Sequence, residues 1–382
     1  MNNLSLHKQI PLKWLICLSV LFLFIILAVG LKPRGFRFAN QVNWIGDQPG
    51  IRFNNFGIAY TNPFNDLIKE NISNDDGFSM EIALKPAGYH QRRFRFIWSL
   101  HDGKDSDQLL MGQWRSWLIL MNGDDYAYNK KTKRITVNAD SQSPMIRFVT
   151  ITTGKEGTKV YFDGKLVRTN KELTLKMPTE GKTRLLLGNS TYGKHPWRGD
   201  VYGLALYEYP LSAQEAGRHY NSWAKDRNFS FADNENPSVL YLFDEMGGTR
   251  ALDHAGGNHH LEIPSMMKTL ERKILVPFWK EFRFDKGFIK DMILNLIGFM
   301  PFGFILFATL TRLGGAVEKH GVLITAALCF SVSMALEILQ AWIPSRSSQM
   351  ADLLLNTLGG WMGAIGCRFF TKVQGQRLKE KG

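Results

Sequence analysis

Two segments near the C-terminus repeat the same spacing of polar residues. Residues 291–298 and 352–359 both read Asp-x-x-x-Asn-x-x-Gly. Positions i, i+4 and i+7 lie on one face of a helix, so each segment would present a carboxylate, an amide and a glycine in a line. Side chains of this kind within apolar helices can bind a polar ligand group, and a carboxylate among them can act as a base.

Three more polar residues lie between the two repeats. Glu337 and Gln340 are spaced i, i+3, and Arg346 follows. Because buried carboxylates are costly without a cation, we expect Arg346 to pair with them. The predicted polar site therefore has seven members: Asp291, Asn295, Glu337, Gln340, Arg346, Asp352 and Asn356.

The elements that must position these residues are apolar helices. A helix needs roughly 20 apolar residues to span a bilayer, and four stretches qualify: residues 14–31, 292–311, 321–343 and 350–370. Basic residues precede the first stretch, bracket the link between the second and third, and follow the fourth. Since basic short loops stay in the cytoplasm, both termini are predicted inside. The two Asp-x-x-x-Asn motifs and the end of the third stretch then lie at one depth, near the outer surface.

Two alternatives stay open at this point. The first stretch could be a cleaved signal peptide, with Ala28-Val29-Gly30 as its small-residue site, although its apolar run is long for that. Asp291 and Asp352 could be helix N-caps, which would make the polar cluster structural. Capping does not account for Asn295 and Asn356, which lie one turn deeper.

The charge and the cysteines exclude two other classes. The net charge of +13 fits basic residues flanking membrane helices, and no nucleic-acid-binding motif accompanies it. The three cysteines, Cys17, Cys329 and Cys367, all lie in apolar stretches. The polar region between the first two stretches therefore has to fold without disulfides.

The order and spacing of the polar residues resemble the VanZ-like family of small membrane proteins. The resemblance covers about residues 285–370 and also includes Phe299, Pro301 and Gly303. It implies that residues 1–35 supply the family's first helix, that residues 285–371 form the other three, and that residues 372–382 are a basic cytoplasmic tail. The family takes its name from a member associated with resistance to the glycopeptide antibiotic teicoplanin. The resemblance thus implies a role in envelope or antibiotic-resistance physiology without naming a reaction.

Residues 45–265 have the pattern of an all-β sandwich, with short apolar runs separated by Gly, Asn and Asp turns. Asp163-Gly164 predicts a type I′ hairpin. The runs at 147–152 and 158–167 and the following strand pair resemble the laminin-G-like, concanavalin A-like jelly roll. A segment similar to the start of such domains comes last here, at 239–258, so we expect a permuted strand order. The predicted fold is a jelly-roll sandwich inserted between the first and second helices of a four-helix transmembrane unit.

The function of this sandwich is less determined than its fold. Jelly rolls of this class bind glycans or proteins, bind calcium, or act as spacers. Glycan cleavage needs carboxylates that converge on the sugar, and the alternating carboxylate run that supplies them is missing from this sequence. Trp114 and Trp197 are candidate glycan-binding residues, with burial in the core as the alternative. Weak calcium candidates, for which turn stabilisation is the competing interpretation, are Asp200, Asp253 and Asn258. No other cofactor is expected.

Residues 266–290 join the two parts. They mix aromatic and basic side chains, a composition typical of a segment lying on the membrane surface. An ordinary basic linker has the same composition.

Three functions fit these features. The first is a non-enzymatic protein of the cell membrane whose outer domain recognises a glycan, cell-wall or surface ligand and whose helices bind an amphiphilic or lipid-linked ligand. The second is a membrane-embedded enzyme acting on a lipid-linked envelope precursor, with Asp352 or Glu337 as general base and Arg346 steadying a phosphate or carboxylate. No nucleophile with an adjacent base is visible, so no catalytic residue is assigned and the first function is favoured. The third is a small transporter, for which four spans are few unless the protein forms an oligomer.

Overall fold

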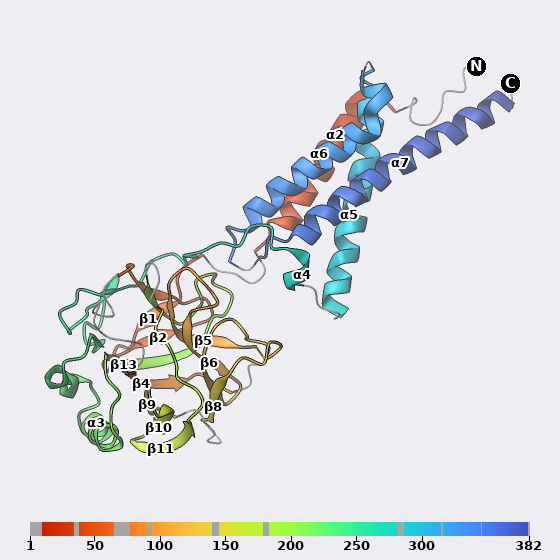
Figure 1. Ribbon diagram of the computed structural model, residues 1–382. Helices are drawn as coiled ribbons and strands as arrows, with labels where there is room; N and C mark the ends of the chain where they lie inside the picture. Colours follow the sequence, from red (N-terminus) through yellow and green to blue (C-terminus); the bar gives the residue numbers. More distant parts are fainter. Residues whose placement is uncertain are drawn as a thin grey trace. The chain divides into compact units, whose positions relative to one another are not determined.

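The computed structural model divides the chain into two compact units, Met1–Gly35 with Arg272–Gly382, and Phe36–Glu271 (Figure 1). We call them the helical unit and the β unit. The structure describes residues 10–33, 38–64, 77–89, 93–139, 145–178, 183–281, 286–314, 316–344 and 346–380. The β unit is thus inserted between the first long helix and the remaining ones, as the sequence predicts.

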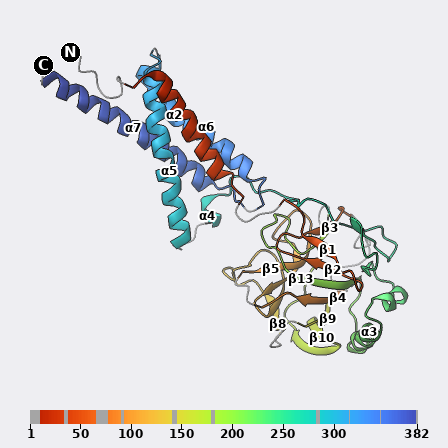
Figure 2. The same ribbon diagram turned by 180° about the vertical axis from the view of Figure 1, so that it is seen from behind.

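The β unit is an antiparallel sandwich of two sheets (Figures 1 and 2). The order in the first sheet is β1 (Val42–Trp44), β2 (Ile51–Phe53), β13 (Gly199–Tyr207), β4 (Phe78–Pro86), β9 (Arg147–Gly154), β10 (Gly157–Phe162) and β11 (Lys165–Asn170), with β14 (Val239–Tyr241) also paired to β13. The order in the second is β15 (Arg250–Ala251), β16 (Leu261–Glu262), β3 (Ala59–Thr61), β12 (Arg184–Leu187), β5 (Arg95–His101), β6 (Leu109–Trp114), β7 (Trp117–Asn122) and β8 (Arg134–Asn138). The last strands of the chain therefore join both sheets.

Local sequence signals account for the turns of this unit. Asp163 and Gly164 have φ angles of +52° and +73°, as a type I′ turn requires, and they connect β10 to β11 with Phe162 opposite Lys165. Ser212 begins α3 (Ala213–Asp226) with a capping box in which its side chain and that of Glu215 each accept a backbone N–H of the other. α3 and the 3₁₀ helix η1 (Ser230–Glu235) follow β13 in the chain.

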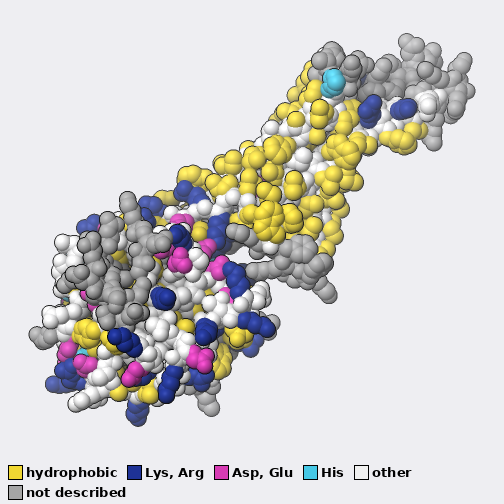
Figure 3. Space-filling model, viewed as in Figure 1, with side chains coloured by type: hydrophobic (Ala, Val, Ile, Leu, Met, Phe, Trp, Pro, Cys, Tyr) yellow, Lys and Arg dark blue, Asp and Glu magenta, His cyan; other side chains and the backbone are white. Residues whose placement is uncertain are grey.

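The helical unit contains α2 (Leu12–Gly30), α5 (Lys286–Thr311), α6 (Ala316–Gln340), α7 (Met350–Glu380) and the short α4 (Phe278–Glu281). α2 packs on α5 and α6, and α7 packs on the same two helices. Hydrophobic side chains make up much of the face of this unit that Figure 3 shows. Phe24 and Leu323, for example, are 68% and 70% exposed. Such a surface suits lipid rather than water.

Three helical segments in the described part of the chain are long and apolar enough to cross a membrane: Leu12–Gly30, Gly287–Thr311 and His320–Gln340. The fourth predicted stretch, 350–370, is helical within α7 but is not among these three. That α7 spans the membrane therefore stays a prediction.

α5 and α7 cross at glycines. A Cβ on Gly359 would lie 2.1 Å from the Leu296 carbonyl oxygen, and one on Gly363 would lie 2.0 Å from that of Met300. Only glycine permits backbones to approach this closely. Gly298, the equivalent of Gly359 in the first repeat, has nothing within 4 Å of its Cβ position. Gly298 therefore makes no close helix contact of this kind, although it occupies the same place in its motif as Gly359.

Candidate functional site

The carboxylate of Glu337 lies at the junction of α6 and α7. The side chain is 1% exposed, and its Oε2 accepts a hydrogen bond from the backbone N–H of Gln349, 2.7 Å away. The Ser348 hydroxyl also hydrogen-bonds this carboxylate. Arg346 and Asp352 are close enough to act on Glu337 electrostatically. Glu337 is therefore the centre of the polar cluster in the helical unit.

A segment just after the β unit covers this junction. The backbone N–H groups of Leu275 and Val276 donate to the Ser348 hydroxyl at 3.0 Å and to the Ser348 carbonyl at 2.9 Å. The Met350 N–H in turn donates to the Val276 carbonyl at 3.0 Å. The predicted surface linker, residues 266–290, is thus hydrogen-bonded to the start of α7 through Leu275 and Val276. Residues 282–285 of this linker lie outside the described part of the chain. Sequence reasoning missed Ser348, whose only signal was a serine just before a helix.

Gln340 and Arg346 bind the C-terminal end of α2. Gln340 Nε2 donates to the Gly30 carbonyl at 3.0 Å. The Arg346 guanidinium donates to the carbonyls of Val29 at 2.7 Å and Lys32 at 3.2 Å. The last carbonyls of a helix lack partners within it, so these two side chains satisfy groups that would otherwise be unpaired. They also attach the α6–α7 junction to the first helix.

Asp352 and Asn356 come from the start of α7. Asp352 is half-buried in the first turn, where a carboxylate favours the helix dipole. Asn356 is 2% exposed and donates from Nδ2 to the Ser333 hydroxyl on α6, 3.0 Å away. Its Oδ1 is buried and accepts no hydrogen bond from the described residues. A buried acceptor in this condition is costly, so Asn356 offers a free oxygen to a ligand or a water.

The two remaining members of the predicted site come from α5. Asp291 is exposed and Asn295 is half-buried, and within the described part of the chain no hydrogen bond or ion pair joins either to the other five. α5 begins at Lys286, so Asp291 is also not its N-cap. Asn295 directly precedes Leu296, whose carbonyl oxygen lies close to Gly359 of α7. The structure brings Arg346 and Asp352 near Glu337, and the convergence of all seven residues stays a prediction.

The two tryptophans proposed to bind glycans differ in the β unit. Trp197 is 1% exposed, and its indole N–H donates to Gln113 Oε1 at 2.7 Å. It belongs to the core, and the prediction that it binds a ligand is wrong. Trp114 is 38% exposed and lies opposite Trp117, also 38% exposed, across the turn from β6 to β7. Arg115 in this turn has a φ of +54°, and its guanidinium lies 4.9 Å from the centre of the Trp114 ring.

Two of the three calcium candidates, Asp200 and Asp253, have protein partners. Asp200 pairs with Arg52 through both carboxylate oxygens, at 2.7 and 2.9 Å. Asp253 accepts backbone N–H groups at both of its oxygens, among them that of Leu240 at 3.0 Å. Asn258 is exposed in a left-handed turn with a φ of +57°. The contacts of Asp200 and Asp253 stabilise the local structure, and calcium binding by the three residues stays a prediction.

A buried histidine with two carboxylates was not anticipated. His101 is 2% exposed, and its Nε2 and Nδ1 lie 3.3 Å from Asp105 and 3.2 Å from Glu271. Burial lowers the pKa of the imidazole, but hydrogen bonds to the two carboxylates and their charges outweigh this effect and raise the pKa to about 9. The Gly103 N–H also lies 3.0 Å from Nδ1, a contact that suits only a neutral ring. Two adjacent carboxylates favour the charged ring more strongly than this single N–H opposes it.

Comparison with protein families finds one match in each part of the chain. Residues 247–371 match VanZ/LLP1, and residues 64–217 match the concanavalin A-like lectin/glucanases superfamily. The chain has a VanZ-like domain and a concanavalin A-like domain. The VanZ-like match begins inside the β unit, before β15, and includes the whole polar cluster. The concanavalin A-like match includes Trp114 and Trp117.

Solved structures show only a weak overall likeness. The chain is similar to the binding domain of botulinum neurotoxin DC in complex with rat synaptotagmin II, at 14% identity and a TM-score of 0.38, over 49% of this chain and 46% of that one. It is also similar to the botulinum neurotoxin serotype D binding domain, at 15% identity and a TM-score of 0.37, over 50% and 47%. The chain thus spans less than half the length of these structures. The comparison with curated proteins found no match.

Proposed function

We propose that this membrane protein recognises a glycan or another surface ligand with its concanavalin A-like domain, outside the cytoplasm, and holds an amphiphilic, lipid-linked ligand with its VanZ-like domain. Its termini lie in the cytoplasm in this proposal, as the basic residues at both ends of the helical unit predict. The protein acts in the cell envelope as a binding protein rather than as an enzyme.

The exposed pair Trp114 and Trp117 carries the glycan half of the proposal. Isolated exposed hydrophobic residues are common on soluble domains. Here two indoles lie opposite each other at the end of one hairpin, with the Arg115 cation over the Trp114 ring. Flat aromatic faces supply large contact area at little entropic cost, and a neighbouring guanidinium can donate several hydrogen bonds to hydroxyl or carboxylate oxygens. A sugar ring presents an apolar face and polar edges that match this surface.

The test is binding of the full-length protein, in detergent micelles, to an array of glycans and cell-wall fragments. The double variant Trp114→Ala, Trp117→Ala should lose the signal. Tyr128→Ala is the matched control, because Tyr128 is 59% exposed but lies on a different loop. The proposal fails if the wild-type protein binds nothing on the array, or if the double variant binds as the wild type does.

The polar cluster supports the lipid-linked half. Asn356 has a buried oxygen without a partner, and the half-buried Asp352 lies one turn away on the same helix. Mass spectrometry of lipids that co-purify with the intact protein would identify the ligand. We expect its yield to fall in Asp352→Asn and Asn356→Leu and to be unchanged in Asp291→Asn, because the Asp291 side chain is exposed. Equal amounts of co-purified ligand in all three variants would contradict binding of a lipid-linked ligand by the polar cluster, and would leave the proposed glycan recognition untouched.

An enzyme acting on a lipid-linked precursor is the second candidate. The observation in its favour is the electrostatic coupling of Glu337 with Asp352 and Arg346. Retained function in the combined variant Glu337→Gln, Asp352→Asn would exclude it, because neither amide can act as a base.

A further inference from the structure

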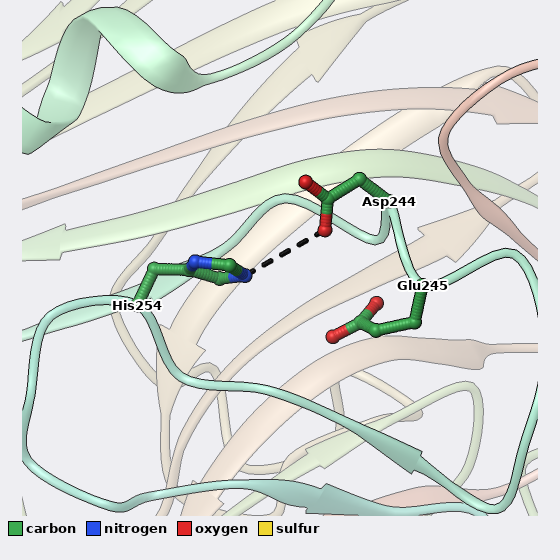
Figure 4. Close-up of side chains that lie close together, drawn as sticks. All are labelled: Asp244, Glu245 and His254. Atoms are coloured by element: carbon green, nitrogen blue, oxygen red, sulfur yellow. Dashed lines mark ion pairs between the residues drawn. The ribbon is translucent and has the colours of Figure 1, made fainter.

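Asp244, Glu245 and His254 lie together in the loops that follow β14 and β15, with their side chains converging on one space (Figure 4). One potential ligand atom from each lies within 4.8 Å of the other two. Among the described residues, no other set of three or more His, Cys, Asp or Glu side chains is arranged in this way. Asp244 and Glu245 also lie outside both family matches, 64–217 and 247–371.

The spacing of Asp244 and His254 suits a shared ion. His254 Nε2 lies 3.6 Å from Asp244 Oδ1, which exceeds the ~3.2 Å limit of an ordinary N–H···O hydrogen bond. Two ligands bound at about 2.1 Å to a tetrahedral zinc ion lie about 3.4 Å apart. The observed separation is therefore close to that of two ligands around one metal.

Glu245 supplies an independent observation. Its Oε1 accepts a hydrogen bond from the Leu252 backbone N–H, which orients the carboxylate in the way that outer hydrogen bonds orient metal ligands. Its Oε2 is buried and accepts no hydrogen bond from any described residue. A buried carboxylate oxygen without a partner is costly, and a cation at the centre of the three side chains would remove that cost.

The surrounding backbone holds the three side chains in place. The His254 N–H donates to the Leu240 carbonyl at 2.8 Å, and the Leu240 N–H donates to the carboxylate of the neighbouring Asp253 at 3.0 Å. On the other side, Phe243 and Met246 flank the two carboxylates, each with a φ of +54°. This conformation is disfavoured for residues other than glycine and persists only where surrounding contacts impose it. The two loops that carry Asp244, Glu245 and His254 are therefore held in place by these contacts.

We propose that Asp244, Glu245 and His254 bind a divalent transition-metal ion such as Zn²⁺. Imidazole is a good ligand for zinc and related metals, whereas Ca²⁺ and Mg²⁺ take oxygen ligands almost exclusively. Three protein ligands leave the fourth tetrahedral position to water or to an external ligand. The site shares no residue with the Trp114 hairpin or with the polar cluster of the helical unit, so it does not depend on the function proposed above.

The test uses the full-length protein in detergent after removal of metals by chelation. Calorimetric titration with Zn²⁺ should show one ion per chain, and Co²⁺ should give the visible absorption of a four-coordinate N/O site. Asp244→Asn and His254→Gln should each weaken Zn²⁺ binding at least tenfold. Asp244→Asn is expected to fold normally, because Asp244 is exposed and, among the described residues, its carboxylate has an ion pair only with His254.

Glu172→Gln is the matched control, because its side chain is 85% exposed and lies away from the cluster. It should bind Zn²⁺ as the wild type does, and a millimolar excess of Ca²⁺ should not displace the ion. Absence of Zn²⁺ binding, equal binding by the wild type and both ligand variants, or displacement by Ca²⁺ would each overturn the proposal.

Discussion

Glu337 on α6 accepts a hydrogen bond from the backbone N–H of Gln349, which lies 12 residues further along the chain and directly precedes α7. The first N–H groups of a helix and of its entry turn lack partners within the helix. A buried carboxylate from one helix thus fixes the start of the next. The same residue that sequence reasoning assigned to a ligand pocket also has a structural role.

Replacement of Glu337 separates these two roles. Glu337→Ala leaves the Gln349 N–H and the Ser348 hydroxyl without their acceptor, and a buried unpaired group costs about 1–3 kcal/mol. We expect a clearly lower midpoint of thermal unfolding in detergent. Glu337→Gln keeps an acceptor oxygen and should unfold close to the wild-type midpoint.

Comparison of Glu337→Ala with Glu337→Gln distinguishes a structural role of Glu337 from a functional role of its charge. If Glu337→Gln is stable but no longer retains the co-purifying ligand, the charge itself has a function. If Glu337→Ala unfolds at the wild-type midpoint, the structural role is wrong.

Replacing the glycine of the Asp-x-x-x-Asn-x-x-Gly motif by alanine should have opposite effects on stability in the two copies. Gly359→Ala places a methyl group 2.1 Å from the Leu296 carbonyl oxygen, so α5 and α7 must separate and the protein should lose stability. Gly298→Ala meets nothing within 4 Å and gains up to about 1 kcal/mol of helix propensity. Thermal unfolding of the two variants, measured side by side, checks this. Equal destabilisation by Gly359→Ala and Gly298→Ala would contradict the close approach of α5 and α7 at Gly359.

Local patterns made the fold of both units predictable. Short apolar runs, alternating in β4 and nearly continuous in β5 and β13, predicted strands, and Asp163-Gly164 predicted its hairpin, because these signals depend only on neighbouring residues. Hydrophobic length gave the helices for the same reason.

Contacts between distant segments were not predictable from the sequence. Trp114 and Trp197 have the same side chain, but Trp197 is buried and Trp114 is exposed. The burial of Trp197 depends on its packing and on a hydrogen bond to Gln113, which is far from Trp197 in the sequence. Arg346 was expected to neutralise carboxylates, but it also binds backbone carbonyls at the end of α2. No sequence pattern shows which helix end lies near a given arginine.

That second role of Arg346 is testable. Arg346→Ala leaves the Val29 and Lys32 carbonyls unpaired and should lower the midpoint of thermal unfolding, since hydrogen bonds from charged groups contribute about 1.5–3 kcal/mol. Arg346→Lys keeps the charge but cannot reproduce two donors in a fixed fork, and we expect an intermediate value. Arg368→Ala, at an exposed position on α7, is the control and should unfold as the wild type does. A midpoint for Arg346→Lys equal to that of the wild type would mean that charge alone accounts for the role of Arg346.

The stability of the β unit should depend on pH through His101. Its pKa is raised to about 9 in the folded protein and is about 6.5 in an unfolded chain, so the folded state binds the proton more tightly. The resulting stabilisation is fully present below about pH 6.5 and is lost as the pH rises through about 9. A shift of this size corresponds to on the order of 3 kcal/mol. Unfolding midpoints measured from pH 6 to pH 10 should therefore fall, and His101→Gln should flatten this slope while lowering the midpoint at pH 6. If the slope is the same in the variant, the ion pairs with Asp105 and Glu271 do not govern it.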